Sequence, residues 1–280
     1  MLINLKQMLQ YAEERKIAVP SFNVYNVESV QAVWQGAQET QTPVIISFGE
    51  SYDSHMPIEA AAALILSYVR DASLPVVLHL DHCRNEKNIL RALRAGFTSV
   101  MFDASARPLQ ENISQSRHIV SLAHALDVSV EGELGYMNEE DGSGVVQGPQ
   151  GYTTVAAAQQ YALESGIDAL AIAIGNAHGI YKGTPTLDLE RLSEIEAATD
   201  IPLVLHGSSG IPFPLLQEAI GRGIRKININ TEVSTAGIQA ARVFLAEHKD
   251  PNTRFETMTK AAEAAMAQVV KKYIHLCSQQ

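Results

Sequence analysis

The segment PVVLHLDHCRNEKNILRALRAGFTSVMFDA, which runs from Pro75 to Ala104, contains the unit that decides the fold of this 280-residue chain. Its apolar run Val76–Asp81 predicts a strand buried on both faces, because it has little of the apolar–polar alternation of a half-exposed strand. A segment of helical periodicity, Glu86–Ala95, follows and ends at Gly96. The next apolar run, Ser99–Ala104, predicts a second strand, so the segment is typical of a strand–helix–strand unit in a parallel sheet.

This alternation of a short apolar run and a longer helical segment occurs eight times along the chain. The expected strands are Ile17–Val24, Val44–Phe48, Val76–Asp81, Ser99–Ala104, Ser129–Leu134, Ala169–Gly175, Leu203–Gly207 and Lys226–Thr231. The expected helices between and after them are Val27–Gln41, Glu59–Asp71, Glu86–Ala95, Leu109–Leu126, Val155–Ser165, Leu189–Thr199, Pro214–Arg222 and Ser234–His248.

Eight strand–helix units without a linker or a break in composition predict one α/β domain that covers residues 1–280. We expect a (β/α)8 TIM barrel with an N-terminal leader helix within residues 1–16 and a C-terminal helical extension over Phe255–Leu276. An open, doubly wound parallel sheet is the alternative fold.

The balance of charged residues limits the classes of partner. The chain has 21 Lys and Arg against 31 Asp and Glu, a net charge of −10, so it lacks the basic surface that a nucleic acid or an anionic membrane requires. We therefore expect no nucleic-acid partner and no membrane partner, and no apolar run approaches the roughly 18 residues of a membrane span. An anion would have to be bound locally, through backbone N–H groups, a few Lys side chains or a metal ion.

The two cysteines indicate the compartment. Cys83 and Cys277 lie far apart and form no CxxC pair, which argues against a disulfide framework and favours a reducing cytoplasm. The charged residues at positions 13–16 also differ from the uncharged core of a signal peptide. We predict a cytoplasmic protein.

Histidines follow three of the expected strands. The active site of a barrel of this type lies at the C-terminal ends of its strands, so His82, His178 and His206 are expected to converge on one mouth. Any one of them alone could be a hydrogen-bonded residue of the mouth, but three imidazoles with an open fourth position are typical of a catalytic zinc site. We predict that the three bind zinc. His79 is expected to point into the barrel core, and Cys83 is left out of the ligand set because adjacent residues of a strand point apart.

Glycine-rich and hydroxyl-rich turns predict a phosphate site at the same mouth. The loops after the seventh and eighth strands read HGSSG (His206–Gly210) and NINT (Asn228–Thr231), and these loops commonly bind phosphate in such barrels. The segment GNAHGIYKG adds Gly179 and the charge of Lys182. Each turn alone could be ordinary turn chemistry, but together they predict that a phosphate monoester binds beside the metal. A long loop, Gly135–Tyr152, is expected to act as a lid or binding loop.

These motifs resemble those of the class II, zinc-dependent ketose-phosphate aldolases, the group of the tagatose-bisphosphate and fructose-bisphosphate aldolases. The motifs that carry the resemblance are VPSFNVYN (19–26), LHLDHC (78–83), VEGELG (130–135), AIAIGNAHGIYKG (171–183), VLHGSSGIP (204–212) and KININTE (226–232). The resemblance implies a retro-aldol cleavage that yields dihydroxyacetone phosphate and an aldehyde, and the reverse condensation. It also implies a homodimer or a homotetramer acting on a small sugar phosphate.

The resemblance assigns roles to particular residues. It implies that His82, His178 and His206 bind one catalytic Zn²⁺, that Glu133 serves a second metal position, and that Asp81 is the acid/base residue. The mobile general base would be Glu139, Glu140 or Asp141 in the lid. A monovalent cation, Na⁺ or K⁺, would lie near the phosphate. The residues implied in binding the substrate are Asn23, Gly179, Lys182, Gly207, Ser208, Ser209, Asn228, Ile229, Asn230 and Thr231.

Departures from the family pattern bear on the substrate. Fructose-bisphosphate-cleaving relatives often have a hydroxyl after the second strand and an Arg in the C-terminal helix, whereas this chain has Gly49 and the segment Lys260–Glu263. A ketose 1-phosphate without a second phosphate is therefore a hypothesis beside a 1,6-bisphosphate, with Lys260 or Arg254 as alternative phosphate ligands. The alternative functions are a metal-dependent sugar-phosphate epimerase or isomerase, and a non-catalytic subunit that supports another aldolase.

Overall fold

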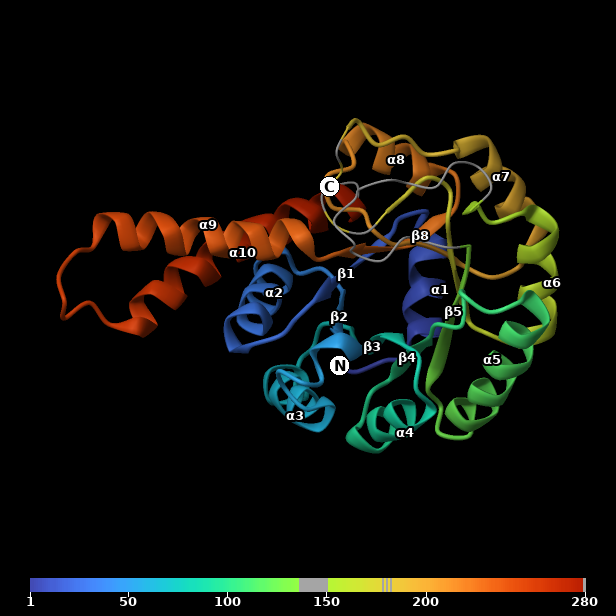
Figure 1. Ribbon diagram of the computed structural model, residues 1–280, viewed down its shortest axis with the longest axis horizontal. Helices are drawn as coiled ribbons and strands as arrows, with labels where there is room; N and C mark the ends of the chain where they lie inside the picture. The colour runs from blue at the N-terminus through green and yellow to red at the C-terminus, as the bar shows by residue number, and fades with distance from the viewer. Residues whose placement is uncertain (136–150, 178, 180, 182, 279–280) are drawn as a thin grey trace.

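The computed structural model describes residues 1–135, 151–177, 179, 181 and 183–278 (Figure 1). Eight parallel strands form a closed barrel in sequence order, and pairing of the first strand with the eighth closes it, which excludes the open sheet. The strands are β1 (Val19–Asn23), β2 (Val44–Gly49), β3 (Val76–Cys83), β4 (Ser99–Phe102), β5 (Ser129–Leu134), β6 (Ala169–Ile172), β7 (Leu203–Leu205) and β8 (Ile224–Ile229).

Helices surround the barrel and confirm the predicted (β/α)8 architecture with its leader and extension (Figure 1). They are α1 (Leu5–Arg15), α2 (Val27–Thr40), the short 3₁₀ helix η1 (Glu50–Tyr52), α3 (Ile58–Val69), α4 (Glu86–Ala95), α5 (Leu109–His124), α6 (Val155–Ser165), α7 (Leu189–Ala198), α8 (Phe213–Gly221), α9 (Thr231–Glu247) and α10 (Phe255–Ser278). Every helix in the described part of the chain is too short or too polar to cross a membrane.

The bounds of several strands differ from those predicted. The sixth and seventh strands were expected to reach Gly175 and Gly207, but both glycines have positive φ, 109° and 60°, and turn the chain out of the sheet earlier. The last strand was expected to include Thr231, which is instead the first residue of α9. Pairing of β8 with β1 ends at Ile229, and the carbonyl of Asn230 then accepts the N–H of Ser234 at 3.0 Å.

Local chemistry explains where the helices begin and end. Helix α7 begins after Asp188, whose carboxylate accepts the N–H of Arg191 at 3.0 Å. Helix α4 ends at Gly96 and α6 ends at Gly166, both with left-handed φ values, 95° and 77°, that glycine adopts without steric cost. The two glycine caps lie at the N-terminal end of the barrel, where they keep the turns into β4 and β6 short. The predicted lid lies largely outside the described residues.

The apolar core has two parts. One lies between the barrel and its helices, and the other fills the N-terminal end of the barrel, where α1 lies inside the ring of helices (Figure 1). The residues of this second part are Leu5, Met8, Leu9, Ala12, Val19, Ile45, Val77, Ala169, Ala171 and Val204. Helix α1 thus closes the bottom of the barrel with apolar side chains and leaves polar side chains for the opposite end.

Helices α9 and α10 pack side by side, and α2 packs against α10. The ends of α9 and α10 that are joined by the segment 248–254 project beyond the barrel (Figure 1). Exposed apolar side chains on this pair are Ile238, Val243, Leu245 and Phe255.

We predict that Leu9→Ala lowers the free energy of unfolding by about 2–5 kcal/mol, because it leaves a cavity in the fully buried cluster below the barrel. The neighbouring exposed residue offers a matched control, Gln10→Ala, which should change this free energy by no more than about 0.5 kcal/mol. Urea denaturation of the two variants measures both values. Equal stability of the two would contradict the role given to α1.

Candidate active site

Strand β3 places two neighbouring residues, Asp81 and His82, at the mouth of the barrel. Successive residues of a regular strand point to opposite sides. At His82, however, the backbone has a left-handed φ of 46°, and the pairing of β3 with β4 shifts register between Leu80 and Cys83. This irregularity brings both side chains to the mouth, and one ligand atom each of Asp81, His82 and His206 lie within 4.8 Å of one another.

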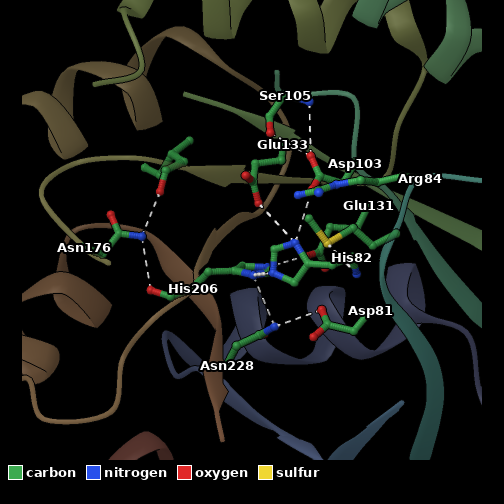
Figure 2. A network of polar contacts seen from close by, with 12 residues as sticks. Asp81, His82, Arg84, Asp103, Ser105, Glu131, Glu133, Asn176, His206 and Asn228 are labelled. Atoms are coloured by element: carbon green, nitrogen blue, oxygen red, sulfur yellow. Dashed lines mark hydrogen bonds and ion pairs between the residues drawn. The ribbon is translucent and has the colours of Figure 1, made fainter. Parts of the chain in front are cut away.

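The imidazoles of His82 and His206 face each other at the mouth (Figure 2). His82 Nε2 and His206 Nδ1 are 2.8 Å apart, and the two rings meet edge to face with their centroids 4.6 Å apart. Two ring nitrogens from different strands thus converge on one point, although the residues are separated by 124 positions in the sequence.

The outer nitrogen of each imidazole faces a carboxylate (Figure 2). His206 Nε2 donates to Glu131 Oε1 at 2.8 Å, and His82 Nδ1 lies 3.5 Å from Asp103 Oδ2 and 3.9 Å from Glu133 Oε2. Histidines that bind metal ions commonly donate their second N–H to a carboxylate in this way. The arrangement therefore suits two histidine ligands that point their inner nitrogens, His82 Nε2 and His206 Nδ1, at the same ion.

Asp81 lies beside the imidazoles between two amides. Its Oδ2 accepts from Asn23 Nδ2 at 2.8 Å, and its Oδ1 accepts from Asn228 Nδ2 at 3.2 Å. Burial alone would raise the pKa of Asp81, but neighbouring cationic groups, first His82 and then Lys226, outweigh it and hold the pKa far below its usual range. Asp81 is therefore a carboxylate that two amides orient and that neighbouring cationic groups keep ionised.

A second pair of carboxylates lies on the other side of His82. Asp103 Oδ2 accepts from Arg84 Nε and Nη2 at 3.1 and 3.0 Å, and Asp103 Oδ1 accepts from the hydroxyl of Ser105 at 2.6 Å. Glu133 is only 2% exposed, and its Oε2 has no hydrogen-bond partner among the described residues. Once the carboxyl group has lost its proton, a buried oxygen of this kind can bind a cation.

The charges of these groups shift their protonation. Burial raises the pKa of Glu133 to about 8, and the neighbouring Asp103 adds to the shift. Burial would lower the pKa of His82, but Asp81 and Asp103 raise it to about 9. Burial lowers the pKa of His206. A divalent cation would compete with the protons on His82 and Glu133, because it needs the deprotonated forms.

The mouth opens into a cavity of about 1000 Å³. Predicted site residues that line it are Asn23, Asp81, His82, Glu133, Gly179, His206, Gly207, Ser209, Asn228, Asn230 and Thr231. The side chains of two others stay in the barrel wall: Ser208 donates to the carbonyl of Leu205 at 3.1 Å, and Ile229 is buried in the core. Their contacts with a ligand remain predictions.

Four predicted site residues, Glu139, Glu140, His178 and Lys182, lie outside the described residues, as does Asp141. The third zinc ligand, the mobile base and the Lys of the phosphate site therefore also remain predictions. The expected core position of His79 is confirmed: the side chain is fully buried and its Nδ1 lies 2.8 Å from the hydroxyl of Ser99.

The site also contains charged residues that were absent from the predicted set. Arg84, Asp103 and Arg107 line the cavity, while Glu131 and Lys226 lie beneath it. The sequence does mark Glu131 and Lys226 as unusual, because each is a charged residue inside an otherwise buried strand. The two strands are distant in sequence, so this signal did not reveal that the two residues pair.

Cys83 is adjacent to His82 but points away from the mouth, as expected. Its thiol donates to Glu50 Oε1 at 3.2 Å, and Glu50 also accepts the N–H of Arg84 at 2.9 Å. Burial and the charge of Glu50 raise the pKa of the Cys83 thiol well above its usual range. The thiol therefore belongs to the wall behind the site.

Comparisons with known proteins concern the family and the fold. The family model described as "Fructose-bisphosphate aldolase class-II" matches residues 3–280. The crystal structure of the YdjI aldolase from Escherichia coli K12 is 34% identical, with a TM-score of 0.87 over 99% of this chain and 97% of that chain. The fructose-bisphosphate aldolase of Campylobacter jejuni is 21% identical, with a TM-score of 0.84 over 99% of this chain and 95% of that chain, and shares the fold.

We predict that neither cysteine of the native protein reacts readily with Ellman's reagent at pH 8, since both Cys83 and Cys277 are buried and burial raises both thiol pKa values. In denaturant, the same assay should count both of the chain's 2 cysteines, which serves as the control. A native thiol that reacts within seconds would show that Cys83 is accessible from the mouth, against the orientation described above.

Proposed function

The chain belongs to the class-II fructose-bisphosphate aldolase family, and from this premise we propose that it is a zinc-dependent aldolase acting on a ketose phosphate. It would cleave a ketose 1-phosphate or 1,6-bisphosphate to dihydroxyacetone phosphate and an aldehyde, and would catalyse the reverse condensation. The observation that carries the proposal is the pair of facing nitrogens, His82 Nε2 and His206 Nδ1, beside the ionised Asp81.

The donor set at the mouth suits zinc. Two imidazole nitrogens converge on one point, and the outer nitrogens of both rings face carboxylates. His178 would supply the third ligand, and Glu133, with its unpartnered Oε2, would serve a second metal position. Bound zinc would supply a Lewis acid that withdraws electrons from the ketose carbonyl.

Asp81 would carry the proton transfer at C4. In cleavage its carboxylate accepts the proton of the C4 hydroxyl while the C3–C4 bond breaks and the electron pair of that bond passes to the carbonyl side. In condensation it returns the proton to the aldehyde oxygen. Asn23 and Asn228 hold the carboxylate in place for this step through their amide groups. The proton at C3 would be transferred by Glu139 or Glu140.

The phosphate of the substrate would bind on the side of the mouth formed by β7 and β8. Gly207, Ser209, Asn230 and Thr231 line the cavity there, and α9 begins at Thr231. Backbone N–H groups at the start of a helix attract anions without the need for a basic surface, which suits a chain of net charge −10. Lys182 and a monovalent cation, Na⁺ or K⁺, would add positive charge.

A ketose 1-phosphate with no second phosphate is the substrate class that we favour. Gly49, the last residue of β2, has no hydroxyl, and Lys260 lies in a separate groove with Glu28 and Glu263. Among the described residues that line the mouth cavity, the Lys and Arg side chains are Arg84 and Arg107. We further propose that residues 1–280 act as one domain, in a cytoplasmic homodimer or homotetramer, with neither nucleic acid nor membrane as a partner.

We predict that the purified protein contains about one zinc ion per chain and releases dihydroxyacetone phosphate from ketose phosphates. A coupled assay over ketose 1-phosphates and hexulose bisphosphates, before and after EDTA, tests both points, with zinc-saturated EDTA as the control. EDTA should abolish activity, added zinc should restore it, and a matching 1-phosphate should react faster than any bisphosphate. Conversion of the substrate without a three-carbon product would instead indicate an epimerase or an isomerase.

We predict that Asp81→Asn lowers kcat by about 10²–10⁴-fold, because an amide cannot accept the C4 proton, while zinc content stays that of the unsubstituted protein. A matched control is Asp71→Asn, which makes the same change at an exposed residue before the other end of β3. Loss of zinc in Asp81→Asn would contradict the assignment and make Asp81 a metal ligand. An unchanged kcat would support a non-catalytic role for the chain.

A further inference from the structure

Two charged side chains inside the barrel have no part in the chemistry proposed above. Glu131 on β5 and Lys226 on β8 are both 0% exposed, and Lys226 Nζ lies 3.0 Å from Glu131 Oε1 and 2.8 Å from Oε2. Because β5 and β8 are not neighbours in the barrel, this ion pair spans the interior from one wall to another.

A buried ion pair is a poor source of stability, because removing two charges from water costs free energy that their attraction hardly exceeds. An apolar pair of similar volume could fill the same space without that cost. The position of this pair beneath the mouth therefore points to a role other than stability.

A third contact of Glu131, with the imidazole of His206, indicates what that role is. Oε1, which already accepts from Lys226, also accepts from His206 Nε2 at 2.8 Å. A carboxylate can accept a hydrogen bond but cannot donate one, so the hydrogen of a neutral His206 must lie on Nε2. The lone pair of the ring is then on Nδ1, the nitrogen that faces His82 Nε2 across the mouth.

Lys226 determines where the carboxylate lies. Its ammonium group contacts both oxygens of Glu131, and Lys226 precedes Asn228, a mouth residue, by two positions on β8. The adjacent buried imidazole, His79, has its Nε2 3.8 Å from Glu131 Oε2, beyond hydrogen-bond distance. Lys226 is thus the charged partner that holds Glu131 against His206.

We propose that Glu131, held by Lys226, is a positioning residue that fixes the ring orientation and the tautomer of His206 so that Nδ1 is presented to the metal ion. The inference rests on the proposed function, in which His206 is a zinc ligand. Glu131 and Lys226 touch neither the substrate nor the metal in this scheme; they act through His206.

The test measures zinc affinity by competition with a chromophoric chelator, together with the melting temperature of the zinc-free protein. Glu131→Gln should weaken zinc binding by about 10–100-fold, the usual loss when the carboxylate partner of a ligand histidine is changed. Because this variant leaves a buried ammonium without its partner, the double variant Glu131→Gln/Lys226→Met is measured beside it. The double variant should show the same loss of zinc affinity with a melting temperature closer to that of the unsubstituted protein.

A matched control comes from another buried polar pair of the barrel. The hydroxyls of Ser21 and Ser47 are 2.6 Å apart and both residues are fully buried, and they take no part in the hydrogen bonds described above for His82 and His206. Ser47→Ala should therefore leave zinc affinity unchanged. In the cobalt-substituted protein, Glu131→Gln should also change the visible absorption of the metal, whereas Ser47→Ala should not.

Two results would overturn the inference. Zinc affinity within twofold of that of the unsubstituted protein in both Glu131 variants would show that His206 needs no positioning. A lower melting temperature without any loss of zinc affinity would give the pair a purely structural role. If the unsubstituted protein itself bound no zinc, the proposed function would fail, a result distinct from failure of the variants alone.

Discussion

Charges enclosed by a barrel have little access to water, and this constraint governs the arrangement of the whole mouth. The N-terminal half of the interior contains apolar side chains and so encloses few charges, since α1 covers that end and contributes Leu5, Met8 and Leu9. The C-terminal half contains the carboxylates of Asp81, Glu131 and Glu133 instead. Each of the first two has cationic or amide partners, from Lys226, His206, Asn23 and Asn228, whereas Glu133 retains an oxygen without a partner among the described residues. Of these three carboxylates, the one with an oxygen that lacks a hydrogen-bond partner is therefore the one proposed to serve a second metal position.

The fold was predictable from the sequence because its signal is periodic and local. Each strand of a barrel is buried on both faces, so runs such as Val76–Asp81 and Ser129–Leu134 are recognisable without knowledge of their neighbours. The convergence of His82 and His206 was also predictable, because the rule that polar strand ends meet at one mouth needs only the order of the strands. The bounds were less accurate, since where a strand ends depends on pairing with its neighbour, as at Ile229 and Thr231.

What the sequence did not predict depends on contacts between distant strands or on a single backbone angle. Alternation along β3 would place Asp81 and His82 on opposite sides, and the left-handed φ of His82 brings them together. The pair of Glu131 and Lys226 joins residues 95 positions apart on strands that are not neighbours. The alternation pattern marks each as an exception within its strand, but only the closed barrel makes them partners.

The two sides of the cavity differ in their lining residues, and in the proposed reaction each side would bind a different part of the substrate. Its proposed phosphate side lies at β7 and β8, where Gly207, Ser209 and Thr231 line it, and Asp81 lies on β3. We consider a ketose whose phosphate binds at β7 and β8 and whose C4 hydroxyl lies against Asp81. Its remaining carbons would extend over the loops after β2, β3 and β4. Those loops carry Tyr52, Arg84 and Arg107, and Tyr52 is fixed by a hydrogen bond of 2.9 Å from Asn230 on the phosphate side. On the proposed function, selectivity among substrates would therefore depend on the loops that contact the aldehyde part, while the proposed zinc site, Asp81 and the proposed phosphate loops would suit any ketose phosphate.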